Sequence, residues 1–140
     1  MSIPVVLRDL DAVVCERGSA AYVVTVSERG TPHVVHAQII RRRSLLVAMV
    51  GAHTADNARR RPHVSVLYPV REPADYSLII DAVATVDVTE DGPRLLLAPT
   101  RAVLHRPAPA PDPTTSPCGS DCLPVALGRA SGDTLPPWRD

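Results

Sequence analysis

The sequence predicts a mainly β fold: a six-stranded antiparallel barrel with a leading helix and one short helix between strands three and four. Six segments rich in valine, leucine and isoleucine follow one another between residues 20 and 106. Only one stretch between them can form a helix, whereas a parallel sheet needs a helix at each crossover. The 140 residues, 45% of them hydrophobic, suffice for one domain around one core.

The first elements are a helix and a hairpin. Residues 5–16 place apolar side chains at helical spacing, and Gly18 ends this segment. Residues 20–27 are rich in β-branched side chains and form the first strand. The turn at 28–31 leads into a second strand over 33–40, so these two strands pair as a hairpin.

The middle of the chain holds the third strand and the short helix. The arginine triplet 41–43 forms a connection into a strand over 44–50. Within residues 51–61, Thr54 is the expected N-cap of a helix that Pro62 stops. The fourth strand follows over 63–68.

The last two strands cover 76–89 and 94–106, with a break expected at Pro99. Asp81 lies in an apolar run, so we expect it to pair with Arg101 or Arg94 of the neighbouring strand.

Proline divides the chain into a folded domain, residues 1–106, and a Pro-rich C-terminal tail, residues 107–140. Eight of the 15 prolines lie from residue 107 onward. The tail carries Cys118 and Cys122, which form either an unremarkable surface pair, a redox-active disulfide or half of a metal site shared across a dimer. Cys15, beside apolar neighbours in the leading helix, is expected in the core.

Composition excludes several function classes. Lys plus Arg and Asp plus Glu both number 15, so no net charge recruits nucleic acid or an anionic membrane. The cations are all arginine, which excludes lysine Schiff bases and the phosphate-binding P-loop. Aromatic residues make up 3% of the chain, too few for a base-stacking surface. The start does not read as a secretory signal, so a cytoplasmic location is expected.

One stretch identifies a family resemblance. After Gly30-Thr31-Pro32-His33-Val34-Val35 and the strand Leu45-Leu46-Val47-Ala48, residues 54–66 read Thr-Ala-Asp-Asn-Ala-Arg-Arg-Arg-Pro-His-Val-Ser-Val. This order resembles the pyridoxamine 5'-phosphate oxidase-like family, whose fold is the flavin-binding split barrel. The family shows Ser-x-Lys-x-x-Asn and then a proline opening an apolar strand. Asn57 and Pro62 keep these places, whereas Ala52 and Thr54 replace the serine and lysine.

The resemblance implies a homodimer with two cofactor sites at its interface, each holding FMN or the related deazaflavin coenzyme. The phosphate would lie at the start of the short helix, where free amides favour an anion. The implied cofactor-binding residues are His36, Ala37, Gln38, Met49 and Val50 along the ring system, and His53, Thr54, Asn57 and Arg61 near the phosphate. The cofactor carries the chemistry, so no catalytic residue and no metal ligand is assigned.

The implied function is an oxidoreductase that transfers a hydride to or from a small organic substrate. Oxidation of pyridoxamine phosphate itself is not expected, because the arginine-rich C-terminal substrate motif is not visible. One alternative is a non-enzymatic binding protein for a flavin, haem or similar planar ligand. Another is a redox-responsive dimeric interaction protein that uses the tail cysteines. The residues do not separate the enzyme from the binding protein, and they leave the substrate open.

Overall fold

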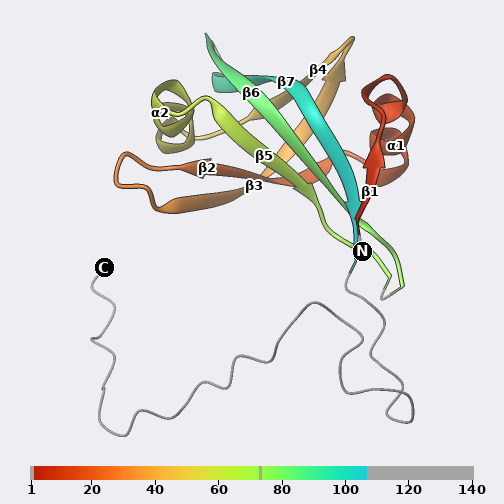
Figure 1. Ribbon diagram of the computed structural model, residues 1–140. Helices are drawn as coiled ribbons and strands as arrows, with labels where there is room; N and C mark the ends of the chain where they lie inside the picture. The colour runs from red at the N-terminus through yellow and green to blue at the C-terminus, as the bar shows by residue number, and fades with distance from the viewer. Residues whose placement is uncertain (1, 73, 107–140) are drawn as a thin grey trace, which may run out of the picture. The chain divides into compact units, whose positions relative to one another are not determined.

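The computed structural model describes residues 2–72 and 74–106. Its elements are β1 (Ser2–Val5), η1 (Leu7–Asp9), α1 (Leu10–Arg17), β2 (Ala20–Val26), β3 (Pro32–Arg42), β4 (Leu45–Met49), α2 (Ala52–Arg60), β5 (His63–Tyr68), β6 (Ser77–Thr89) and β7 (Gly92–His105). The strands form one antiparallel sheet in the order β1-β7-β4-β3-β2-β5-β6 (Figure 1). Since β6 also pairs with β7, six strands close into a barrel, and the predicted fold is confirmed.

The barrel interior is filled by aliphatic side chains that alternate along each strand. In β6, for example, Leu78, Ile80, Ala82 and Ala84 are buried, whereas their neighbours in sequence are more exposed. This period of two results from the strand pleat, which points successive side chains to opposite faces. Tyr68 is the one aromatic residue among the buried hydrophobic side chains of the described chain.

The predicted break at Pro99 is a β-bulge inside a continuous strand. Asp81 pairs with Arg101 but Ala82 pairs with Pro99, which leaves Thr100 as the extra residue of β7. On the other edge of β7, β4 pairs as far as Leu97 and β1 starts at Ala102. Pro99 lies between these two paired stretches, so its missing amide hydrogen leaves no ladder bond unmade there.

The Asp81 carboxylate contacts Arg101 as expected. The Arg101 guanidinium donates to Asp81 at 3.1 Å, and the Ser65 hydroxyl donates to the same carboxylate at 3.0 Å. The other candidate partner, Arg94, instead pairs with Asp87 at 2.6 Å.

The predicted start of the leading helix is wrong. Residues 2–5 form β1, which pairs with the end of β7, and α1 begins only at Leu10 after the 3₁₀ turn η1. Pairing with a distant strand overrides the local helical spacing, and Pro4 is tolerated because β1 pairs on one edge only. Cys15 is exposed and not in the core, because it lies one residue past buried Val14 on the helix.

The arginine triplet is also displaced from its predicted position in a connection. Arg41 and Arg42 belong to β3, where they pair with Leu46 and Leu45, so the turn is limited to Arg43 and Ser44. Arg43 has a φ of 53°, the left-handed conformation that a tight turn requires.

The predicted tail, residues 107–140, and its Cys118 and Cys122 lie outside the described residues. Neither α1 nor α2 nor any other described helix has the length and apolar character needed to cross a membrane.

Candidate functional site

Helix α2 carries the motif on which the resemblance rests, but Thr54 is not its N-cap. The helix begins at Ala52 after Gly51, and no side chain caps its first amides. Thr54 is instead buried, with its hydroxyl 3.3 Å from Nε2 of His33 on β3. The helix starts three residues earlier than predicted, because Gly51 adopts the extended conformation of an N-cap.

Asn57 joins α2 to the barrel through a buried hydrogen bond. Its side-chain amide donates to the hydroxyl of Thr25 on β2 over 3.2 Å, and the two residues are 4% and 0% exposed. Buried polar groups need partners, so this pair fixes the helix on the strand. The Asn57 amide nitrogen and the Thr25 hydroxyl are therefore bonded to each other.

Two histidines meet at the start of α2. The rings of His33 and His53 lie edge to face with centroids 4.7 Å apart. His36 lies elsewhere, in an edge-to-face contact with Tyr22 of β2 at 5.5 Å. Among residues 2–72 and 74–106, no group of three or more potential ligands could hold a metal ion.

A cleft of about 310 Å³ lies between α2 and the turn that joins β2 to β3; we call it the hairpin cleft. It is lined by Ser27, Glu28, Arg29, His53, Asp56, Asn57 and Arg60. Arg60 pairs with Glu28 at 3.1 Å, and Asp56 pairs with Arg59 at 2.6 Å. Within the described chain, Arg29 makes no ion pair or hydrogen bond, so the cleft contains one arginine without an acidic partner.

The Arg61 guanidinium holds the hairpin in place. It donates to the backbone carbonyls of Ser27 and Glu28 at 3.1 and 3.2 Å. These bonds tie the residue after α2 to the β2–β3 turn and shape the hairpin cleft. Arg61 therefore positions the cleft, and its Nε and Nη2 already have acceptors.

The remaining candidate residues differ in accessibility. His36, Gln38, Met49 and His53 are exposed, Val50 is half-buried and Ala37 is buried. Ile39 pairs with Ala48 and both are buried, so Gln38 and Met49, the next residues along the two antiparallel strands, lie together on the outer surface.

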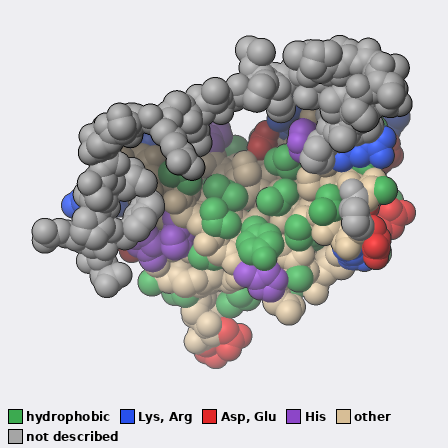
Figure 2. Space-filling model, turned by 90° about the horizontal axis from the view of Figure 1, so that it is seen from below, with side chains coloured by type: hydrophobic (Ala, Val, Ile, Leu, Met, Phe, Trp, Pro, Cys, Tyr) green, Lys and Arg blue, Asp and Glu red, His purple; other side chains and the backbone are tan. Residues whose placement is uncertain are grey.

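The outer face of β3, β2, β5 and β6 is an apolar surface that the sequence analysis did not single out. The strand registers place His36, Tyr22, Leu67 and Ile79 side by side in one row. Val34 and Ile40 of β3 are more than half exposed on the same face. Figure 2 shows hydrophobic side chains and histidines gathered on the lower side of the molecule, where β2 and β3 lie in Figure 1. The sequence does carry a signal for this surface in β3. Val34 and Ile40 occupy outward positions of that strand, where a solvent-facing strand would carry polar side chains.

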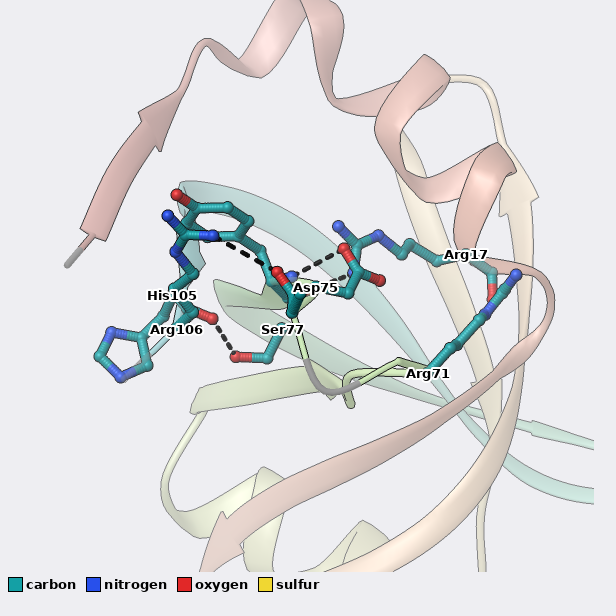
Figure 3. A network of polar contacts seen from close by, with 8 residues as sticks. Arg17, Arg71, Asp75, Ser77, His105 and Arg106 are labelled. Carbon is teal, nitrogen blue, oxygen red and sulfur yellow. Dashed lines mark hydrogen bonds and ion pairs between the residues drawn. The ribbon is translucent and has the colours of Figure 1, made fainter. Parts of the chain in front are cut away.

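A second polar network lies where α1 ends and β6 begins (Figure 3). The Arg17 guanidinium donates to the carbonyl of Tyr76 and pairs with Asp75 at 3.6 Å, and its side chain is 11% exposed. Arg71 donates to the carbonyl of Arg17, and Arg106 stacks on the Tyr76 ring at 4.5 Å. These contacts hold the residues just before β6 against the end of α1.

Tyr68 of β5 is buried inside the barrel. Its hydroxyl has no hydrogen-bond partner among the described residues. Burial raises the pKa of Tyr68 to about 12, and the positive charge of Arg41 opposes this shift. The phenol therefore stays neutral at physiological pH and acts as a core side chain.

Comparison with known proteins finds relatives in mycobacteria. A protein of Mycobacterium bovis called Uncharacterized protein Mb0449c is 32% identical over 117 residues, which are 74% of this chain and 82% of that protein. The Mycobacterium tuberculosis protein MT0457 matches with the same identity and coverage. No protein-family model matches the sequence.

Solved structures match the fold. A Listeria innocua protein provisionally named a pyridoxamine 5'-phosphate oxidase has a TM-score of 0.60 at 17% identity, covering 71% of this chain and 98% of that one. HutZ, the haem storage protein of Vibrio cholerae, has a TM-score of 0.55 at 17% identity, covering 69% and 91%. An F420 reductase has a TM-score of 0.52 at 16% identity, covering 62% and 90%. At these identities the likeness shows a shared fold.

Proposed function

We propose that this protein binds a flavin or deazaflavin coenzyme. The premise is that the chain belongs to the family of the mycobacterial protein Mb0449c and has the split-barrel fold of pyridoxamine 5'-phosphate oxidase-like proteins. Its activity is then hydride transfer to or from a small organic substrate. The observation that carries this proposal is the hairpin cleft, which brings together Arg29, an arginine without an acidic partner among the described residues, and His53 at the start of α2.

The hairpin cleft fits the phosphate end of such a coenzyme. Arg29 has no acidic partner within the described chain, and the first amides of α2 have no side-chain cap. Both features favour an anion, the first by charge and the second by free donors and the helix dipole. His53, exposed at the same place, adds a donor. These groups add to those that the resemblance implied, because the Thr54 hydroxyl already contacts His33 and the Asn57 amide nitrogen already donates to Thr25.

The ring system would lie on the outer surface where β4 ends, just before α2 begins. Gln38 and Met49 lie together there, and Gln38 offers an amide to the polar edge of a ring while Met49 offers an apolar contact. FMN or the deazaflavin coenzyme, when bound, supplies the hydride chemistry. The side chains of this surface orient the ring and limit the access of water to it.

The exposed apolar face supports a homodimer as the working form. Tyr22, Val34 and Ile40 are exposed on one sheet face, and large apolar patches mark interaction sites. A second copy on this face would cover the ring surface from the other side. Each site would then be completed by the partner, as the family resemblance implies.

The test compares FMN with riboflavin, which has the same ring and no phosphate. We expect fluorescence titration of the full chain to show tighter binding of FMN, and Arg29→Gln to remove most of that preference. Arg42→Gln, an exposed arginine that does not line the cleft, is the matched control and should keep it. Equal affinity for FMN and riboflavin in the unaltered protein, or an unchanged preference in Arg29→Gln, contradicts the assignment of the phosphate to the cleft.

A further inference from the structure

A second cavity, of about 370 Å³, lies at the opposite end of β4 from α2; we call it the N-terminal pocket. Its apolar lining comes from Leu7 of η1 and Leu10 of α1, from Leu45 and Leu46 of β4, and from Pro99 at the bulge of β7. The volume is in the range of small-molecule sites, which are mostly apolar with a few polar groups. It shares no lining residue with the hairpin cleft.

The charged residues around the N-terminal pocket do not balance. Asp11 lines it, but both carboxylate oxygens of Asp11 are bound by Arg41, at 3.1 and 3.0 Å. Arg8 also lines it and has only a 3.8 Å contact with the exposed neighbour Asp9. Arg43 makes no ion pair or hydrogen bond with any described residue. Three guanidiniums and two carboxylates leave an excess of one positive charge.

The position of Arg43 follows from the turn that carries it. The two-residue connection between β3 and β4 requires the left-handed conformation that Arg43 adopts. Arginine has a Cβ and is disfavoured there relative to asparagine or glycine. The turn nevertheless has a guanidinium beside a pocket whose acidic residue is already neutralised.

We propose that the N-terminal pocket binds a small amphipathic anion, a carboxylate attached to a short apolar chain or ring. The apolar part would lie on the leucines of η1, α1 and β4, where it would be removed from water. The carboxylate would lie at the rim, where Arg43 and Arg8 supply guanidinium donors that match its two oxygens. This site is separate from the proposed coenzyme site and does not depend on it.

The test uses octanoate and 1-octanol, which share an apolar chain and differ in charge. Isothermal titration of the full chain should show tighter binding of octanoate, with an affinity that falls as ionic strength rises. Arg43→Asn, which keeps the left-handed turn, should weaken octanoate binding about threefold to fivefold and leave octanol binding unchanged. Ser44→Trp, which places a large side chain at the pocket wall, should weaken both ligands.

Arg42→Gln is the matched control, since Arg42 is exposed next to Arg43 and does not line the pocket. Its octanoate affinity should equal that of the unaltered chain. Equal affinities for octanoate and octanol, no binding of octanoate, or the same loss in Arg42→Gln as in Arg43→Asn would each overturn the proposal. FMN titrations of Arg43→Asn distinguish the two sites, because this variant should bind FMN normally whether or not the N-terminal pocket exists as proposed.

Discussion

Replacing Asn57 by alanine should reduce stability more than any change at the exposed arginines around it. The Asn57 amide and the Thr25 hydroxyl are both buried and bonded to each other at 3.2 Å. Asn57→Ala removes the donor and leaves the hydroxyl without it, which costs about 1–3 kcal/mol for a buried group. Urea unfolding, followed by circular dichroism, should therefore show a midpoint lowered with the slope unchanged.

The control and the rescue separate this bond from general damage to α2. Asp56→Ala breaks an exposed pair with Arg59 on the same helix and should cost less than about 1 kcal/mol. Asn57→Leu combined with Thr25→Val replaces both polar partners by apolar groups, so it should be more stable than the sum of the two single changes. A loss below about 0.5 kcal/mol in Asn57→Ala, or strict additivity in the double variant, would refute the structural role assigned to Asn57.

Four further outcomes follow from other contacts. Tyr68→Phe removes a buried hydroxyl without a protein partner and should raise the free energy of unfolding by about 1 kcal/mol, measured by urea titration. In the folded protein the pKa of Tyr68 is raised from 10 to about 12, so the unfolded chain releases this proton at a lower pH. The free energy of unfolding therefore falls as the pH rises from 10 toward 12. Tyr68→Phe should remove this part of the loss. Arg17→Leu should destabilise by roughly 2 kcal/mol and speed amide exchange at Tyr76, since it removes a nearly buried donor to that backbone. Arg101→Gln should cost under about 1 kcal/mol in thermal unfolding, because its ion pair with Asp81 is exposed.

The barrel was predictable because its strands carry their own signals. Valine-rich segments, the hairpin turn at Gly30 and the run from Ser77 to Thr89 all appear in the sequence as they appear in the structure. The start of the chain was not predictable in this way. The apolar residues near Val5 satisfy helical spacing, but pairing of β1 with β7 connects residues about 100 positions apart, and no local pattern contains that contact.

The sequence predicted the short helix that lines the hairpin cleft, but not the partners of its polar side chains. The motif identified α2 and its neighbourhood, yet Thr54 and Asn57 direct their polar groups to His33 and Thr25. Sequence spacing does not say which face of a short helix is buried when that face includes polar residues. Arg29 was missed for a related reason: a turn arginine next to Glu28 looks solvated, and only the fold shows that Glu28 is paired with Arg60.

The central claim is that the chain is a homodimer that binds a flavin or deazaflavin coenzyme. Sedimentation velocity of the full chain tests this claim most directly, with separate runs detected at the absorbance bands of FMN, the deazaflavin coenzyme and haem. The account predicts that FMN or the deazaflavin coenzyme sediments with a dimer at one ligand per chain. A protein that stays monomeric, or a dimer that carries neither coenzyme, would contradict it. A dimer that binds haem alone would contradict the hydride-transfer proposal and favour a ligand-binding protein of the same fold.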